Sequence, residues 1–459
     1  MHPDDLGRTL KIDMDDGTAT SFADAVEIAG RRRVGISLGA GWEIGHTATA
    51  TVVTTLRCAV RAFKGGVFVE AEGDPIASHG WGRGLSLTHL VADAGAVIVD
   101  RVPDDVPVVI AILGGAFAGA SRRARTLYAT WDGWAGGVVV DPDRRLPEQG
   151  RMSLAGNLAG AVAISEAFHA AKGNVLAARR DAGLSLWRPD LDWHDPEAVG
   201  PDLAFLPSGA WLLGLGHLGQ AYAWALGSLP YPDNAHPIIG LVDPQAVVGA
   251  NLETGILLAA DDDRVPKTRV VARELESLGF TTIVVERRFG LGFERTPDEP
   301  AIAFAGFDAP EPRRLLEQVG FVQVVDAGLG GGPRYLDILV HAFPASRSAV
   351  DCFPSTEDPR ALDRVLGQPA YESEIGALEA SGISRETARC GVTELAGRTA
   401  GAAFVGAAAA SLVVAGTIRD MHGGRRVEVV SLSMSDVSSP RVAANPHQAP
   451  RNTGYVGVA

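Results

Sequence analysis

The sequence predicts an α/β protein made of two Rossmann-like halves in tandem, with nucleotide binding in the C-terminal half. Short apolar runs alternate with alanine-rich segments of helical spacing along the chain. One apolar run leads directly into a glycine turn, residues 214–219 (GLGHLG). The length of 459 residues also exceeds that of an ordinary single core. We therefore expect two domains built from repeated strand–helix units.

The N-terminal half, expected over residues 1–184, has the order of a nucleotide-binding unit without its phosphate turn. A strand at 33–38 leads into the glycine-rich segment 39–45 (GAGWEIG), then a helix, then a strand at 66–70 that ends on Glu70. The glycines of 39–45 have the wrong spacing for a phosphate turn. We predict that this half is degenerate and inactive. Further strands are expected at 106–113 and 137–140, and an alanine-rich helix at 156–172.

The C-terminal half repeats this order after a linker at 185–207. It is expected over 208–424, with an excursion rich in Pro, Ser and acidic residues at 344–390. An alanine-rich helix ends each half, so we expect a pseudo-duplicated chain, a pseudo-dimer within one chain; two unrelated α/β units of similar look are the alternative. The tail, 425–459, is expected to be irregular apart from one strand at 427–432. Strands are expected at 211–213, 238–242, 282–286, 301–305, 322–326 and 335–343, and the last helix at 399–421.

Asp243 ends the second strand after the glycine turn. This completes the order strand, glycine turn, helix, strand and acid of a mononucleotide-binding unit. The glycines let the backbone approach phosphate, the helix N-terminus offers free N–H groups, and the acid binds ribose hydroxyls. On its own this pattern most often indicates NAD(P) or FAD.

The residues after Asp243 favour a different nucleotide. Asn251 lies eight residues past the acid, Lys267 lies 24 past it, and Asp308 follows a later strand. This set resembles the ubiquitin-activating superfamily, which includes the adenylating enzymes of thiamin and molybdopterin biosynthesis, over roughly 208–424. The resemblance implies ATP and Mg²⁺ as cofactors. By this resemblance the phosphate loop is formed by Gly214, Gly216 and Gly219, and the ribose ligand is Asp243. The phosphate-binding residues are Asn251 and Lys267, and the Mg²⁺ ligand is Asp308.

Two of these assignments, those of Lys267 and Asp308, have a plainer structural alternative. Lys267 opens a helix pattern and would otherwise belong to a solvated face, although only four of the 41 basic residues are lysine. Asp308 would otherwise cap the following helix. His217, inside the glycine turn, is expected to be an exposed space-filling residue.

Two departures from the superfamily affect the chemistry. Its turn continues from Asn-Leu to an arginine that contacts phosphate, whereas here the turn reads Asn251-Leu252-Glu253-Thr254. An arginine from the N-terminal half would have to compensate. The zinc-binding CxxC pairs of many relatives are absent, so the excursion is expected to be held by packing alone. The candidate arginines are Arg8, Arg31, Arg32 and Arg33.

The same resemblance implies that a cysteine takes part in the step that follows adenylation. In the superfamily an acyl group often passes from the adenylate to a cysteine before the C-terminal helix, and Cys390 best matches that position. Arg389 and a nearby helix N-terminus are expected to lower the pKa of its thiol. Cys352, inside the excursion, is the competing acceptor, a nearby hydroxyl is another, and a buried inert thiol is the plainer reading of both cysteines.

Composition and charge exclude several classes of protein. The net charge of −14 argues against nucleic-acid binding. No apolar run reaches the roughly 18 residues of a membrane span, and residues 400–415, which come closest, are expected to form a buried, closely packed helix. The N-terminus lacks a signal-peptide pattern, and three cysteines form no disulfide framework. We expect a cytoplasmic protein.

The resemblance implies an enzyme that adenylates the C-terminal carboxylate of a ubiquitin-like or sulfur-carrier protein. Transfer to Cys390 and a separate carrier-conjugating, E2-like partner would follow, as in a bacterial protein-conjugation pathway. The alternatives are a peptide-modifying or sulfur-carrier adenylyltransferase, an NAD(P)- or FAD-dependent oxidoreductase, and a non-catalytic scaffold.

Overall fold

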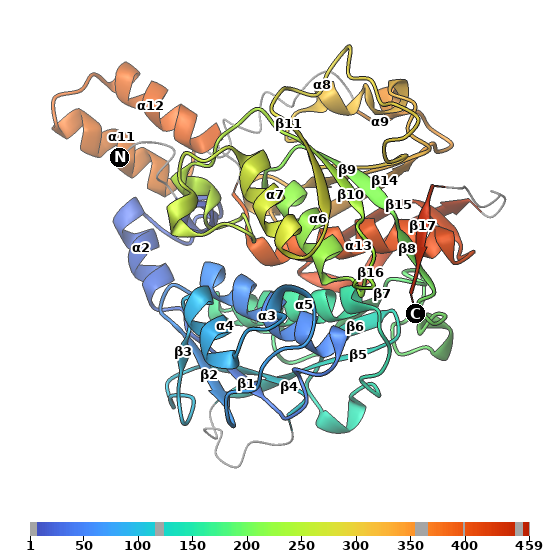
Figure 1. Cartoon of the computed structure of the whole chain (residues 1–459). Helices are drawn as coiled ribbons and strands as arrows, with labels where there is room; N and C mark the ends of the chain where they lie inside the picture. The colour runs from blue at the N-terminus through green and yellow to red at the C-terminus, as the bar shows by residue number, and fades with distance from the viewer. Residues whose placement is uncertain (1–6, 115–123, 354–365, 398–399, 446–452, 459) are drawn as a thin grey trace.

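The computed structural model describes residues 7–114, 124–353, 366–397, 400–445 and 453–458 (Figure 1). Two large sheets form the frame, with strand orders β3-β2-β1-β4-β5-β6-β7 and β11-β10-β9-β12-β13-β14-β15-β16. The first consists of β1 (Val34–Leu38), β2 (Val67–Ala71), β3 (Val97–Ile98), β4 (Val108–Ile112), β5 (Arg125–Asp132), β6 (Ala135–Val139) and β7 (Ala182–Ser185). The second consists of β9 (Gly209–Leu213), β10 (Ile238–Val242), β11 (Thr281–Val285), β12 (Ile302–Ala305), β13 (Gln323–Leu329), β14 (Asp337–Phe343), β15 (Arg426–Ser433) and β16 (Asp436–Asn445).

The two sheets share one topology. In the first, β3, β2, β1, β4 and β5 are parallel, and β6 and β7 follow antiparallel. In the second, β11, β10, β9, β12 and β13 are parallel, and β14, β15 and β16 follow antiparallel. The strand order 3-2-1-4 with helical crossovers is that of a Rossmann-like unit. The predicted fold class, two Rossmann-like halves in tandem, is confirmed.

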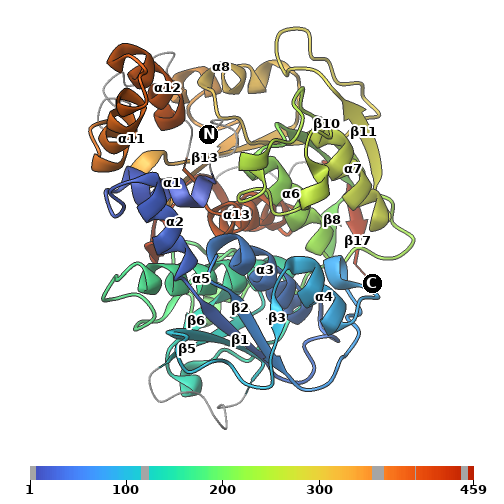
Figure 2. The same ribbon diagram turned by 90° about the vertical axis from the view of Figure 1, so that its left-hand side faces the viewer.

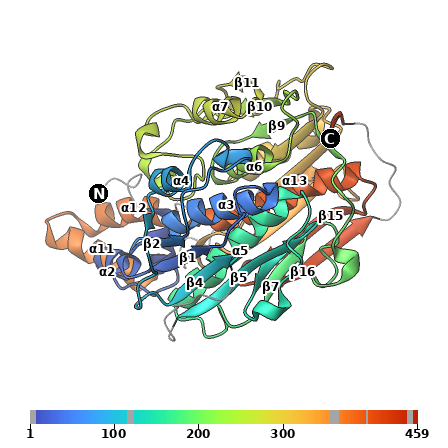
Figure 3. The ribbon, with the colours of Figure 1, turned by 60° about the horizontal axis from the view of Figure 1, so that its bottom comes forward.

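Four long helices lie between the sheets (Figure 3): α3 (His46–Ala62), α5 (Ser153–Ala171), α6 (His217–Ser228) and α13 (Ala403–Met421). α5 packs on α3, and α13 packs on both α5 and α6. Small residues permit this approach, because a Cβ on Gly156 would lie 2.3 Å from the Thr47 carbonyl oxygen of α3. One apolar core therefore joins both halves.

Helix α13 is the apolar segment predicted to be buried. By length and composition it could cross a membrane, yet 83% of its apolar window is buried inside the protein. It begins at Ala403 rather than at 399, and residue 399 lies outside the described residues. The prediction of a closely packed core helix is confirmed.

The C-terminal tail differs from its prediction. Instead of one isolated strand it forms the antiparallel hairpin β15–β16, which completes the second sheet against β14. A further strand, β17 (Tyr455–Gly457), pairs with β8 (Phe205–Pro207) in the predicted linker. The local pattern of β16 is weak because this strand lies at the edge of the sheet, where packing on neighbouring strands constrains the sequence least.

Shorter helices surround this frame: α1 (Arg8–Asp15), α2 (Phe22–Gly30), α4 (Leu87–Ala94), α7 (Lys267–Ser277), α8 (Pro310–Arg313), α9 (Ala349–Cys352), α11 (Pro369–Ala380) and α12 (Arg385–Gly397). The α11–α12 hairpin of the excursion packs on α1 and α2 (Figure 2), through an apolar cluster that includes Met14 and Tyr371. Buried polar contacts add to it, because the Tyr371 hydroxyl donates to Asp15, which also pairs with Lys11. The prediction that packing alone holds the excursion is therefore incomplete.

Candidate functional site

The glycine turn between β9 and α6 uses each glycine differently. Gly214 has φ +83°, a left-handed conformation that favours glycine. A Cβ on Gly219 would lie 1.9 Å from the Gly214 carbonyl oxygen, so this glycine lets the helix pack closely on the turn. A Cβ on Gly216 would meet nothing within 4 Å. The middle glycine therefore leaves backbone open to a ligand at the helix N-terminus.

A cavity of about 1060 Å³ lies beside this turn at the carboxyl ends of β9, β10 and β12. Open α/β sheets bind ligands at this edge, where the strand order reverses. Six of the eight predicted site residues line the cavity: Gly214, Gly216, Asp243, Asn251, Lys267 and Asp308. Gly219 lies behind the turn, and Cys390 is not among the described residues that line the cavity.

Asp243, at the end of β10, shapes the loop as well as facing the cavity. One carboxylate oxygen accepts the Leu215 N–H at 2.7 Å, and the other accepts the Gln245 N–H at 2.7 Å. The first bond joins the acid to the glycine turn. Since each carboxylate oxygen has a second lone pair, these bonds are compatible with the predicted contact to ribose.

Lys267 is the first residue of α7 and is only 5% exposed. Its Nζ donates to the Gln245 side-chain oxygen at 2.7 Å. Burial lowers the pKa of Lys267, the charges of Asp243 and Asp308 oppose that effect, and Arg8 adds to it. A buried ammonium in this cavity does not belong to a solvated helix face, so that alternative is wrong.

Asn251 and Asp308 complete the predicted set. The Asn251 Oδ1 accepts the Val248 N–H at 3.1 Å, which fixes the side-chain amide within its turn. Asp308 follows β12, and the residue that caps α8 is Ala309, with no side-chain hydrogen bond. The helix-cap alternative for Asp308 is therefore wrong, and Asp308 is among the residues that line the cavity.

Of the four candidate arginines, Arg8 reaches the cavity. It comes from α1, far from the other lining residues in sequence. Two lining arginines were not predicted, Arg288 and Arg313, and Arg313 donates to the carbonyl oxygens of Phe307 and Ala327. The only sequence signal for Arg313 is its position five residues after Asp308. The other candidates pair elsewhere: Arg31 with Glu27, Arg32 with Asp13, and Arg33 with Asp105.

His217 is not the exposed residue that was predicted. Its ring packs on α13, where a Cβ on Gly406 would lie 2.4 Å from the His217 Nε2. Burial lowers the pKa of His217 to about 4. The ring is therefore neutral at pH 7 and joins the glycine turn to the start of α13.

The three cysteines differ in exposure. Cys58 is buried, and burial raises the pKa of its thiol to about 12. Cys352 ends α9 and is half-buried, and burial raises its pKa too. Cys390 is exposed on the excursion hairpin. It lies within α12, five residues after the helix begins, rather than at a helix N-terminus.

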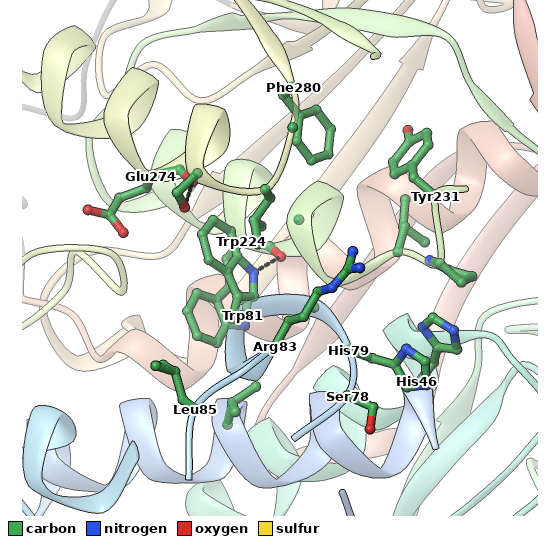
Figure 4. Close-up of a pocket in the computed structure, with 18 of the residues that line it drawn as sticks. His46, Ser78, His79, Trp81, Arg83, Leu85, Trp224, Tyr231, Glu274 and Phe280 are labelled. Atoms are coloured by element: carbon green, nitrogen blue, oxygen red, sulfur yellow. Dashed lines mark hydrogen bonds between the residues drawn. The ribbon is translucent and has the colours of Figure 1, made fainter. Parts of the chain in front are cut away.

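A second cavity, of about 980 Å³, lies between the halves at the C-terminal end of α6 (Figure 4). The indole of Trp81 stacks on Trp224 with ring centroids 5.0 Å apart, and its Nε1 donates to the Trp224 carbonyl oxygen at 2.8 Å. His46 and His79 stack beside it at 3.5 Å. No predicted site residue lines this cavity among the described residues, and its aromatic contacts join the two halves.

Comparisons with known proteins divide the chain as the sheets do. Residues 33–186 match the family described as the BilD N-terminal domain, and residues 206–424 match the BilD C-terminal domain. The bacterial E1-like protein BilD of Collimonas sp. (strain OK412) is 36% identical over 464 residues, which cover 96% of this chain and 95% of that protein. Among solved structures, E. coli MccB aligns at 13% identity over 71% of this chain and 96% of its own, with a TM-score of 0.34. PaaA aligns at 14% identity over 51% of this chain and 63% of its own, with a TM-score of 0.32.

Proposed function

We propose that this chain, which belongs to the BilD family of bacterial E1-like proteins, uses ATP and Mg²⁺ to adenylate the C-terminal carboxylate of a ubiquitin-like protein. One observation carries the proposal. A single cavity is lined by the glycine turn, by the buried Lys267, by Asp308 after β12 and by Arg8 from the N-terminal half. This combination suits a triphosphate better than a dinucleotide.

The proposed chemistry brings two anions together. A carboxylate attacks the α-phosphate, pyrophosphate leaves, and an acyl-adenylate remains. Fixed cations and N–H donors must therefore face the reacting phosphate. In the proposal Gly216 and the start of α6 offer N–H groups, and Asp243 binds the ribose. Asn251 and Lys267 hold the phosphates, and Arg8 supplies the additional arginine.

In the proposal the cavity also takes Mg²⁺, which would neutralise phosphate charge when bound. Among the residues that the structure describes, no three His, Cys, Asp or Glu side chains are grouped into a metal site made of protein alone. Mg²⁺ is commonly held by one or two carboxylates together with substrate phosphates and water. Asp308 is the carboxylate that we assign to it.

We further propose that the N-terminal half is inactive. A Cβ on Gly39, at the start of its glycine-rich segment, would lie 2.0 Å from the Leu113 carbonyl oxygen. Trp42 of the same segment is 1% exposed. Glu70, the counterpart of Asp243, accepts the Val102 N–H at 3.0 Å instead of bonding to the glycine-rich segment. These contacts support the proposal, because they show a closely packed segment rather than a backbone left open to a ligand.

The second chemical step is proposed for Cys390. Its exposure on the excursion hairpin suits an acceptor that must meet both the activated carrier and a separate E2-like conjugating partner. Cys58 is buried with a raised pKa, which makes it a poor nucleophile.

Calorimetric titration tests the nucleotide assignment. Full-length protein is titrated with ATP–Mg²⁺, with NADH and with NADPH under one set of conditions. We expect a saturating signal with ATP–Mg²⁺ alone. Saturation by a nicotinamide nucleotide, with none by ATP–Mg²⁺, would establish the oxidoreductase alternative instead.

Carrier-dependent exchange of labelled pyrophosphate into ATP then tests the acceptor. Small β-grasp proteins that end in Gly are compared with short peptides. Exchange with the protein carrier is expected, and exchange with peptides alone would favour the peptide-modifying alternative.

A further inference from the structure

Helix α1, which carries Arg8, begins without a side-chain cap of its own. Its N-cap residue is Gly7, and its first turn holds no acidic residue. The first N–H groups of a helix have no intrahelical acceptors, and the helix dipole favours negative charge beside them. This helix therefore requires an acceptor from elsewhere in the molecule.

Glu253, in the C-terminal half, supplies that acceptor. Its Oε2 accepts the Thr9 N–H at 2.7 Å, and its Oε1 lies 3.0 Å from the Lys64 Nζ. The Glu253 side chain is 13% exposed. A Cβ on Gly7 would lie 2.4 Å from the same Oε1, so only glycine at that position lets the carboxylate approach. The contact is a helix cap made between the two halves of the chain.

Both partners of this contact have sequence neighbours in the cavity beside the glycine turn, where the proposed function places the nucleotide (the nucleotide cavity). Arg8 precedes Thr9, Thr254 follows Glu253, and both Arg8 and Thr254 line the cavity. The charge of Arg8 contributes to the lowered pKa of Lys267, so the two cations act on one space. A shift at the start of α1 would consequently move a cation of the proposed site.

Arg61, near the end of α3, holds the same loop from the other side. Its Nε and Nη2 donate to the carbonyl oxygens of Gly255 and Leu258 at 3.2 and 2.7 Å. Its own carbonyl oxygen accepts the Thr9 hydroxyl at 3.4 Å. The segment 253–258 is thus fixed to the N-terminal half at both ends, which gives Glu253 a rigid base.

We propose that Glu253 is a positioning residue for adenylation: it caps α1 across the two halves and thereby holds Arg8 in the nucleotide cavity. The inference rests on the proposed function, because Arg8 acts there on the phosphates. It assigns no contact between Glu253 and substrate. Its effect passes through Arg8 alone.

A double-mutant cycle tests this inference. Carrier-dependent pyrophosphate exchange is measured for wild type, Glu253→Ala, Arg8→Ala and the double variant. Loss of a charge-assisted hydrogen bond is expected to raise the KM for ATP by roughly tenfold in Glu253→Ala. In the double variant the KM is expected to equal that of Arg8→Ala. Independent, additive losses, or an unchanged KM in Glu253→Ala, would overturn the inference.

Three further variants separate positioning from folding. Glu253→Gln keeps an oxygen for the Thr9 N–H and should recover most of the affinity for ATP. Gly7→Ala keeps every charge yet forces the carboxylate away, so it should raise the KM like Glu253→Ala. Glu286→Ala, which removes an exposed acid paired with Arg269 outside the cavity, is the matched control and should behave as wild type.

The outcomes distinguish the two proposals. A wild-type chain that shows no exchange with any carrier contradicts the proposed function. An active wild type with an unchanged KM in Gly7→Ala would contradict the positioning role alone, even if Glu253→Ala fails to fold.

Discussion

Lys267→Met separates the cation of the proposed site from the fold. Methionine keeps the apolar stem and removes the ammonium. The Lys267 Nζ donates to a neutral amide, that of Gln245, so the change leaves no broken contact between buried charges. The expected result is a large loss of activity with little change in stability.

The structure sets both magnitudes. Removing one preorganised donor to developing charge typically lowers a rate by about 10²–10³, or about 3–4 kcal/mol of transition-state stabilisation. The lowered pKa of Lys267 shows that its surroundings disfavour the charged form, in spite of Asp243 and Asp308. Replacing a buried charge of this kind is expected to leave the free energy of unfolding within about 1 kcal/mol or to increase it.

Two measurements check this prediction. Carrier-dependent pyrophosphate exchange reports the rate, and denaturant unfolding reports the stability. Arg269→Met on the same helix removes an exposed charge paired with Glu286 and should retain full exchange. Retained exchange in Lys267→Met, or loss of exchange that merely follows unfolding, would refute the reasoning.

Three other variants test separate parts of the account. Asp308→Asn should raise the Mg²⁺ concentration needed for half-maximal exchange by about tenfold; an unchanged Mg²⁺ dependence would remove Asp308 from the metal site. Cys390→Ala should leave exchange intact and abolish a covalent carrier adduct on non-reducing gels; an undiminished adduct would move the acceptor elsewhere. His169→Gln should make the protein less sensitive to acid, because burial lowers the pKa of His169 to about 4, helped by Lys172 and Arg180. The pKa of this histidine is about 6.5 in the unfolded chain, so between about pH 6.5 and about pH 4 only the unfolded state binds the proton. The free energy of unfolding of the wild type therefore falls by up to about 3 kcal/mol as the pH falls through this range. Equal pH dependence of stability in the variant and the wild type would contradict this.

The sequence predicts which residues meet at the cavity beside the glycine turn because these parts are local. The glycine turn, Asp243 and Lys267 belong to one strand–helix–strand–helix unit, and each follows its strand at a fixed offset. The edge of a parallel sheet then brings them together. Kinship with E1-like proteins, suggested by the same residues, is confirmed at the level of the family.

The rest depends on contacts between distant segments. Thr9 and Glu253 are 244 residues apart in the chain, so no local pattern distinguishes Arg8 from the neighbouring candidates. His217 looks exposed in sequence, and only the placement of α13 buries it. In the hairpin β15–β16, the outer strand β16 is mostly exposed, and the hairpin joins the sheet through the pairing of β15 with β14. In each case the tertiary partner outweighs the local preference.

Direct detection of the reaction product tests the central claim. The protein is incubated with ATP–Mg²⁺ and a β-grasp carrier that ends in Gly, and the mixture is analysed by mass spectrometry. We predict a carrier that gains AMP at its C-terminal carboxylate, together with released pyrophosphate. A carrier without AMP, with the nucleotide recovered intact or as ADP and orthophosphate, would contradict the account.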